Sequence, residues 1–255
     1  MVFDRQSELS SLMTEGYRAA LPDAQFVDFD ETTPEQVRAS MNVMSPGDLV
    51  VLVQSGSFRL DNFRFRLELF KRELCVIEHP HLRRMQGDEL ATYVDAIAYD
   101  KEYYRTVGPK IKAAIDGAKR IVVSCAETEL VYDGPFETAK LNTGDYAGMK
   151  NVGGQFPIGE VFTEPALLEN VNGTVDLFAF ADTNFELMVP ERPIRATIEK
   201  GILVNVEYAP SEFVAMMDHI KADEALTVRE LGFGMNRALT RHRFLKDVGS
   251  YERMC

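Results

Sequence analysis

Apolar and polar positions alternate in short blocks at the start of the chain, in an order that predicts strand, helix and strand. Residues 24–30 form an extended piece, Thr33-Pro34-Glu35 begins a helix, and an apolar run at 49–53 follows the turn sequence Ser45-Pro46-Gly47-Asp48. An uninterrupted apolar run of this length is typical of a strand that is buried on both faces, as in a parallel sheet.

The same alternation continues as far as residue 124. Apolar side chains at helical spacing predict a helix at 62–71, and the apolar run at 74–77 predicts the next buried strand. A long helical stretch at 87–117 then precedes another apolar run at 120–124. Because helices alternate with buried strands, this half of the chain is predicted to be a parallel sheet wrapped by helices.

The pattern changes after Cys125. Glycine and asparagine become frequent, and the extended segments are shorter, as at 174–182 and 202–208. One amphipathic helix is predicted at 211–225, where four apolar side chains share a face. The second half of the chain is therefore predicted to be rich in β-structure.

These patterns predict an α/β fold class with two domains. Residues 1–125 form an N-terminal parallel α/β domain, and residues 126–255 form a β-rich α+β domain. A chain of 255 residues with 45% hydrophobic residues is long enough to bury a core in each.

Charge and cysteine content narrow the possible partners. The formal net charge of -12 argues against a nucleic acid or an anionic membrane as the main partner, because both would repel the protein. The three cysteines fit no disulfide framework, no signal-peptide pattern opens the chain, and no apolar run approaches the roughly 20 residues that span a bilayer. We predict a cytoplasmic protein.

Two glutamate motifs lie in the second half of the chain. The first is Gly154-Gln155-Phe156-Pro157-Ile158-Gly159-Glu160-Val161-Phe162, in which glycine and proline turns present a carboxylate. The second is Arg229-Glu230-Leu231-Gly232-Phe233-Gly234. Together these motifs resemble the signature of the aminopeptidase T family, and the similarity extends over residues 40–255.

The resemblance implies a metal site and a dimer. In that family two metal ions, commonly zinc, cobalt or magnesium, activate a water molecule, and the enzymes are typically dimeric. Glu160 would match a metal ligand and Glu230 a carboxylate that bridges the metals. Paired divalent ions need such bridging carboxylates, which makes the assignment chemically reasonable.

The family's other functional residues are two histidines, an aspartate and a catalytic tyrosine, which would begin roughly where the chain reaches Cys255. The related 2,5-dihydroxypyridine dioxygenases hold iron with two histidines and an aspartate of the same distal region. His242 and Tyr251 fall before that point and match none of these positions. Two interpretations stay open: the chain is a fragment of a longer enzyme, or it is a natural short relative. No catalytic residue is assigned.

Two further groups are candidates for substrate binding. His79 and His81 follow the predicted strand at 74–77, and ligands of open α/β sheets bind at the carboxyl ends of strands. We favour the simpler interpretation that they are exposed histidines at a polar strand exit. Arg237 belongs to a basic cluster that could bind a carboxylate, although a solvated face or a subunit contact is the preferred interpretation.

The favoured functional hypothesis is an aminopeptidase-T-like protein with an incomplete metal site and no cofactor. It would bind or help to process a peptide, for instance a precursor in peptide modification. The alternative is a divalent-metal-dependent aminopeptidase, or a related ring-cleaving dioxygenase, whose other ligands are absent from this chain. A third hypothesis is a structural half of a homodimer or heterodimer. The predicted partners are a peptide or small-molecule ligand and a second subunit.

Overall fold

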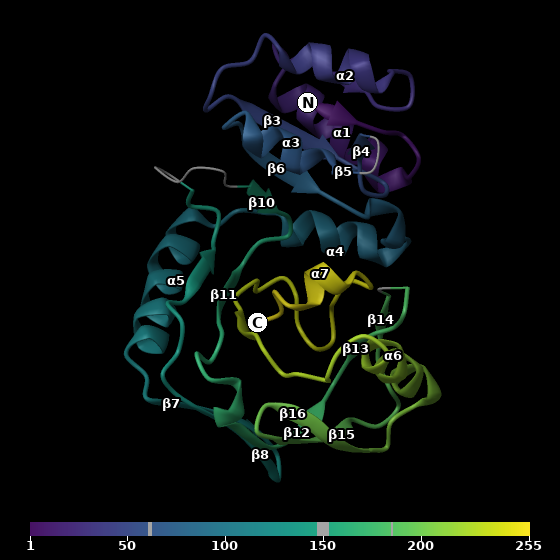
Figure 1. The fold of residues 1–255 in the computed structure, drawn as a ribbon. Helices are drawn as coiled ribbons and strands as arrows, with labels where there is room; N and C mark the ends of the chain where they lie inside the picture. The colour runs from purple at the N-terminus through teal and green to yellow at the C-terminus, as the bar shows by residue number, and fades with distance from the viewer. Residues whose placement is uncertain (61–62, 147–152, 185) are drawn as a thin grey trace. The chain divides into compact units, whose positions relative to one another are not determined.

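The structure is a computed structural model that describes residues 1–60, 63–146, 153–184 and 186–255. The chain folds into two compact units, and each unit is built from two separate stretches of sequence. The first unit contains Met1–Tyr99 and Gly144–Ile158, and the second contains Asp100–Thr143 and Gly159–Cys255. Figure 1 follows the chain through both units and labels their elements.

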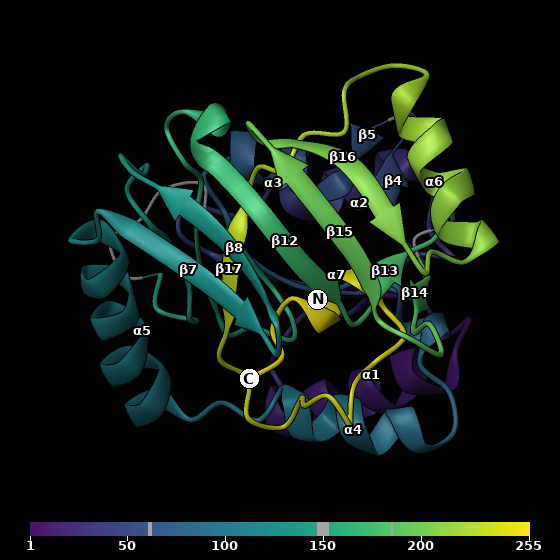
Figure 2. The ribbon, with the colours of Figure 1, turned by 90° about the horizontal axis from the view of Figure 1, so that it is seen from below.

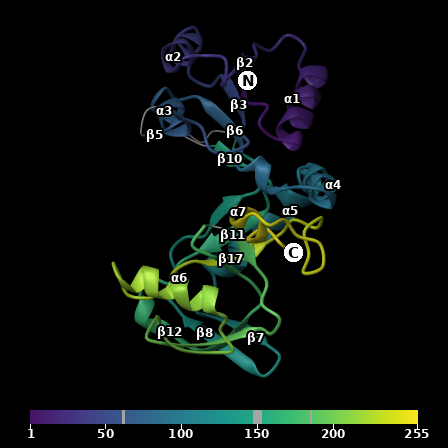
Figure 3. The same ribbon diagram turned by 90° about the vertical axis from the view of Figure 1, so that its right-hand side faces the viewer.

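The first unit is an open parallel sheet with helices on both faces. Its strands run in the order β10-β6-β3-β1-β2, and all of the neighbouring pairs are parallel. Helices α2 and α3 cover one face, and α1 covers the other (Figure 3). The elements of this unit are β1 (Val2–Phe3), α1 (Glu8–Ala20), β2 (Val27–Asp28), α2 (Pro34–Met41), β3 (Leu49–Val53), β4 (Arg59–Leu60), β5 (Phe63–Arg64), α3 (Phe65–Lys71), β6 (Cys75–His79), η1 (Leu82–Arg84), α4 (Asp88–Ala96) and β10 (Gly153–Gln155).

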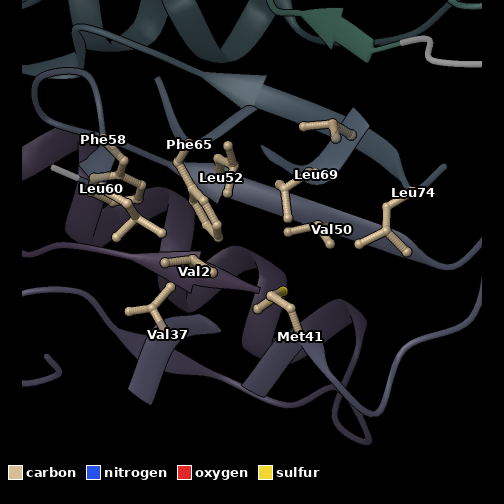
Figure 4. Packing of buried hydrophobic residues seen from close by; sticks show 11 residues of the cluster. Val2, Val37, Met41, Val50, Leu52, Phe58, Leu60, Phe65, Leu69 and Leu74 are labelled. Carbon is tan, nitrogen blue, oxygen red and sulfur yellow. The ribbon is translucent and has the colours of Figure 1, made fainter. Parts of the chain in front are cut away.

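The main core of the first unit lies between the sheet and helices α2 and α3 (Figure 4). Successive strand residues point to opposite faces, so Val50 and Leu52 of β3 enter this core together. Phe65 and Leu69 of α3 meet them from the helix side, and both are at most 1% exposed. This packing explains why β3 reads as a continuous apolar run: its remaining residues face the layer that contains α1.

The second unit is built mainly from antiparallel sheets. A five-stranded sheet has the order β16-β15-β12-β8-β7, with α6 beside β16 (Figure 2), and a three-stranded sheet has the order β17-β11-β9. The elements are α5 (Lys101–Asp116), β7 (Arg120–Cys125), β8 (Thr128–Asp133), β9 (Lys140–Asn142), β11 (Glu160–Thr163), η2 (Leu168–Asn170), β12 (Val171–Leu177), β13 (Phe180–Ala181), β14 (Leu187–Met188), β15 (Ile194–Glu199), β16 (Ile202–Glu207), α6 (Ser211–Lys221), β17 (Leu231–Gly234) and α7 (Val248–Tyr251).

The predicted fold class is confirmed, because a parallel sheet is followed by antiparallel sheets. Three details differ from the sequence prediction. The strand at 120–125 was expected in the parallel sheet, but β7 turns at Ala126 and pairs antiparallel with β8. The predicted helix at 87–117 is two helices, because the side chain of Asp100 accepts the N–H of Tyr103 and starts α5 anew.

The third difference is β10, which returns from later in the chain to pair with β6 and complete the first sheet. A single junction near residue 125 would fall between the paired strands β7 and β8, whereas the two units exchange chain near residues 99, 143 and 158. None of the helices in the described residues is both long and apolar enough to cross a membrane.

Candidate functional site around Glu160

Glu160 opens β11, the central strand of the three-stranded sheet in the second unit. Its backbone is flanked by Asn142 of β9 on one side and Gly234 of β17 on the other. Because side chains alternate along a strand, Glu160 and Val161 lie on opposite faces. Val161 is fully buried in the apolar cluster that contains Tyr104 and Met235. The sequence indicated a carboxylate presented by a turn, whereas the structure fixes it on a paired strand.

The face that carries Glu160 is lined by glycines. A Cβ atom on Gly232 would lie 2.7 Å from Oε1 of Glu160, so the missing side chain makes room for the carboxylate. A Cβ atom on Gly234 would lie 1.8 Å from the carbonyl oxygen of Met254, so the C-terminal segment can approach only a glycine. Gly159, immediately before Glu160, has a φ of 118° that favours glycine.

Arg253 brings a positive charge to Glu160. The Nη2 atom of Arg253 lies 3.5 Å from Oε2 of Glu160, and the two side chains are 9% and 5% exposed. The Nη1 atom of the same guanidinium donates a hydrogen bond to the Glu252 carboxylate. Removing one partner of a buried ion pair costs about 3–5 kcal/mol, because the remaining charge is left uncompensated. Loss of either side chain would therefore leave an uncompensated buried charge, which is a different quantity from the net stability that the pair supplies.

The carboxylates around Arg253 titrate abnormally. Burial raises the pKa of Glu160 to about 7; Arg253 opposes this rise, and the charges of Glu252 and Glu230 add to it. Partial desolvation, followed by the charges of Glu252 and Glu164, also raises the pKa of Glu230. A carboxyl group that titrates near neutrality can exchange a proton with a ligand, which makes Glu160 a candidate functional residue.

Glu230 and Tyr251 complete the surroundings of this site. Glu230 is an exposed residue directly before β17, the neighbour of β11, and its charge reaches Glu160. Burial, helped by the charges of Glu252 and Glu160, raises the pKa of Tyr251. The sequence motifs singled out Glu160 and Glu230, and the structure brings their charges together. No motif pointed to Arg253, because one arginine among the 28 basic residues carries no pattern of its own.

His79 lies at the carboxyl end of β6 in the first unit. It is 1% exposed, contrary to the expectation of an exposed histidine. The hydroxyl of Tyr17 is 2.8 Å from its Nε2, and that of Tyr93 is 2.8 Å from its Nδ1. Burial lowers the pKa of His79 to about 3, so the ring is neutral at pH 7. With both ring nitrogens engaged, His79 is a structural residue of the unit.

The carboxyl edge of the same sheet is filled by the protein's own polar groups. The strand order reverses between β1 and β3, and such a switch point is the usual ligand site of an open α/β sheet. Here Asp4, which is 2% exposed, accepts the backbone N–H of Ser55 at 2.8 Å and the hydroxyl of Ser55 at 2.5 Å. The Ser55 hydroxyl also bonds to Ser10 of α1. The Asp4 carboxylate is therefore satisfied within the fold.

The other predicted substrate-binding residues lie apart from one another in the chain. His81 is half-buried in the first unit, with a left-handed φ of 58°, and its backbone N–H donates to the carbonyl of Gly56. Arg237 is exposed in the second unit, where its Nη2 lies 2.6 Å from Asp100 and its guanidinium covers the Tyr103 ring. A substrate-binding role for these residues stays a prediction.

The Glu160 region contains carboxylate oxygen donors. The carboxylates of Glu160 and Glu230 are the oxygen donors that bind divalent ions such as magnesium and that bridge paired metals. Within the described ranges of the chain, however, no group of three His, Cys, Asp or Glu side chains is placed to hold a metal ion. The carboxylates fit the oxygen-donor part of a site, and further ligands would be needed to complete it.

Comparison with known proteins adds information on the fold. No known protein family matches the chain, and no curated protein matches it. Among solved structures, one match covers 91% of this chain and 69% of the other, with a TM-score of 0.57 and 16% sequence identity. It is the 2,5-dihydroxypyridine dioxygenase from Pseudomonas putida KT2440. In fold, the chain is similar to that dioxygenase. The comparisons give no support to aminopeptidase T.

Proposed function

We propose that the protein is a divalent-metal-dependent enzyme with carboxylate ligands, similar in fold to a ring-cleaving dioxygenase. The observation that carries this proposal is the buried Glu160, held on a glycine-lined strand face with Glu230 and Glu252 near enough to raise its pKa. The fold likeness to the dioxygenase supports it. Metal-dependent peptide hydrolysis is the other reaction compatible with these carboxylates.

The local chemistry favours a bound cation. Three carboxylates (Glu160, Glu230 and Glu252) lie near two cationic groups, those of Arg253 and Lys140, so negative charge is in excess. Such repulsion between carboxylates is relieved by proton binding or by a cation. Glu160 and Glu230 would supply oxygen ligands to the metal, and further ligands would be needed to complete the site. A metal there would act as a Lewis acid on a substrate oxygen and lower the pKa of bound water.

The proposal is tested by metal binding to the full chain. Isothermal titration calorimetry with zinc, cobalt, magnesium and ferrous ions, the last under argon, should show binding that Glu160→Gln and Glu230→Gln each weaken. The matched control is Glu199→Gln, because Glu199 is an exposed glutamate of β15 in the same unit. If no ion binds at millimolar concentration, or if the control weakens binding equally, the proposal is wrong.

A second candidate function is peptide binding without catalysis, and two observations favour it. Arg253 already balances part of the charge on Glu160 without a metal. In the same unit, β16 is an edge strand whose start is already bonded to residues 226–228, which leaves residues 204–207 of its outer edge for a peptide. A cavity of about 240 Å³ beside it is lined by apolar side chains of α6 such as Phe213 and Met217. Edge strands bind extended peptides through main-chain hydrogen bonds, while adjacent pockets take side chains.

Calorimetry separates this second function from the first. Metal-depleted protein should bind a peptide with micromolar affinity, and Met217→Ala should weaken the binding without changing any metal titration. A peptide-modification precursor encoded near the gene is the first ligand to test. Absence of binding by such peptides would count against this function. Light scattering on the same samples measures the molar mass in solution. A homodimer should have twice the mass of one chain. If the protein instead pairs with a different subunit, the purified chain should have the mass of a monomer.

A further inference from the structure

The five-stranded sheet of the second unit ends in two edge strands, β7 and β16, which differ in how they are protected (Figure 2). The start of β16 is bonded to residues 226–228, and its pairing with β15 is shifted by an irregularity between Thr197 and Ile198. Along the rest of β16, Asn205 and Glu207 expose polar side chains. Bulges, partial cover and polar side chains limit the length over which an edge can pair with another strand.

Within the described residues, β7 carries none of these protections. Its register with β8 is continuous from Arg120 to Cys125, and no other described residue forms a backbone hydrogen bond with its outer edge. The segment 121–125 contains no charged residue and no proline. Because an unpaired apolar edge is a template for another strand, β7 is the edge of this sheet that is best suited to pairing.

The side chains of β7 are only partly covered by the rest of the unit. Ile121 and Val123 face the core of the sheet but are half-buried at its margin, whereas Leu130 and Tyr132 of the neighbouring β8 are buried. On the opposite face, Val122 is 43% exposed. A strand added beside β7 would therefore cover apolar side chains on both faces of the sheet and also pair its backbone groups.

Alternation along β7 decides which of its backbone groups point outward. The two-residue loop at 126–127 makes Cys125 and Thr128 the closing pair of the β7–β8 hairpin, so the N–H and C=O groups of Val122 and Ser124 point away from β8. In an antiparallel ladder with a twofold axis at Val123, Val122 of one copy meets Ser124 of the other and exchanges both hydrogen bonds with it. Val123 then lies opposite itself.

The charges that flank β7 are complementary in this register. Lys119 precedes the strand and Glu127 follows it in the turn, and both are exposed. With Val123 on the twofold axis, positions equally far before and after it face each other, so Lys119 of each copy faces Glu127 of the other. Opposite charges across a ladder stabilise it, and like charges destabilise it. The flanks of the strand match those of its own copy, which indicates a second copy of this chain as the partner.

We propose that β7 pairs with β7 of a second copy, antiparallel about Val123, and joins two five-stranded sheets into one continuous sheet. Each copy contributes the same residues, as expected for a twofold dimer. The pairing removes an exposed edge from both copies. This inference does not depend on whether the protein binds a metal or a peptide, so those tests can fail without affecting it.

Charge reversal tests the partner and the register together. Sedimentation velocity should show dimers of the wild-type protein at micromolar concentration. Lys119→Glu and Glu127→Lys each place like charges opposite one another twice per dimer, and each should weaken association about fivefold or more. The double variant restores opposite charges and should return to within about twofold of the wild type. Lys221→Glu, at an exposed position of α6 in the same unit, changes the net charge equally and should have no effect.

Disulfide trapping measures the register directly. In a background where Cys75, Cys125 and Cys255 are replaced by serine, Val123→Cys should form a cross-linked dimer under mild oxidation. Opposite residues of a non-hydrogen-bonded pair have Cα atoms about 4.5 Å apart, which suits a disulfide. Val122→Cys is the matched control, because its twin lies two positions along the ladder, about 7–8 Å away, beyond the reach of a disulfide.

The outcomes separate this dimer from one built on another surface. Rescue by the double variant together with cross-linking at Val123 supports the proposal, because neither result follows from a contact elsewhere. A wild-type protein that stays monomeric at high micromolar concentration would disprove it, as would a dimer that neither charge reversal weakens. Cross-linking at Val122 but not at Val123 would show that the proposed register is wrong.

Discussion

At the scale of single residues, the buried carboxyl group of Glu160 makes the stability of the fold depend on pH. Its pKa is about 7 in the folded protein, against 4.5 for an ordinary glutamate. Between pH 4.5 and pH 7, therefore, Glu160 keeps its proton in the folded state and has lost it in the unfolded state. Stability from this group is fully present below pH 4.5 and is lost as the pH rises through 7. A buried carboxylate that destabilises its own fold at neutral pH is consistent with a functional constraint.

The change Glu160→Gln keeps the shape of the side chain and removes this titration. Between pH 5 and pH 8 the wild type should lose about 2–3 kcal/mol more unfolding free energy than the variant, whatever constant offset the substitution itself adds. Urea unfolding at both pH values, in the presence of a chelator, measures the difference. Glu199→Gln should show no such difference from the wild type, and equal behaviour of the two variants would mean that Glu160 titrates like a surface group.

The pH dependence of stability expected from His79 has the opposite sign to that of Glu160. Its pKa is about 3 in the folded protein, against 6.5 in the unfolded chain, so only unfolded molecules take up a proton between these values. Stability from this group is present above pH 6.5 and is lost as the pH falls toward 3, by about 1.4 kcal/mol per pH unit.

Removal of the ring tests the titration of His79. Between pH 7 and pH 5, wild-type protein should lose about 2 kcal/mol more unfolding free energy than His79→Gln. The control is His219→Gln in α6, whose exposed side chain contributes little to the native packing. A pH slope in His79→Gln as steep as that of the wild type would refute the assignment of a neutral buried ring.

The sequence identifies only part of this chemistry. Glu160 and Glu230 stand in recognisable motifs because glycines must surround a carboxylate on a crowded strand face, and glycine patterns are visible in a sequence. Arg253 is brought to Glu160 by the path of residues 248–255, which no local pattern encodes. His79 was interpreted as an exposed residue at the end of a strand. Its two tyrosine partners are 62 and 14 residues away along the chain, so no local pattern indicates that they bury it.

At the scale of elements, glycines within helices give a sharp test of the packing. Gly16 in α1 has no atom within 4 Å of an added Cβ, so Gly16→Ala should stabilise the protein by about 0.5–1 kcal/mol through the loss of backbone freedom in the unfolded chain. Gly108 in α5 would place its Cβ 2.7 Å from Thr143, so Gly108→Ala should destabilise by about 1–3 kcal/mol. Thermal unfolding of the two variants measures both changes in stability. If both substitutions stabilise, or both destabilise, the space described around Gly16 or around Gly108 is contradicted.

Elements with a strong local signal were predictable, and elements defined by distant partners were not. The strand at 49–53 and the helix start at Pro34, capped by Thr33, agree with their patterns because burial and capping act locally. The helix at Ser211 also begins as predicted, although no side chain caps it. The assignment of 120–125 to the parallel sheet failed because an apolar strand does not reveal whether its neighbour runs parallel or antiparallel. β10 was missed because two of its three residues are glycines, which give no apolar signal.

At the scale of the whole molecule, the chain leaves each unit and returns to it. The first sheet takes β10 from residues 153–155, after the chain has passed through α5, β7, β8 and β9 of the second unit. The backbone groups of β6 that face β10 have their partners in that returning stretch. The first unit is therefore complete only when residues 144–158 are present.

This connectivity predicts the behaviour of fragments. A protein of residues 1–125 lacks β10 and separates β7 from β8, so it should aggregate and unfold without cooperativity, because it exposes two strands that need partners. Joining residue 99 to residue 144 with a short Gly-Ser linker should instead give a soluble unit with a cooperative urea transition. The join is short, because a Cβ on Gly144 would lie 2.8 Å from the Tyr99 ring. Gel filtration and circular dichroism compare the two. A cooperative transition in the 1–125 fragment would show that β10 is dispensable and that a junction near 125 describes the folding units better.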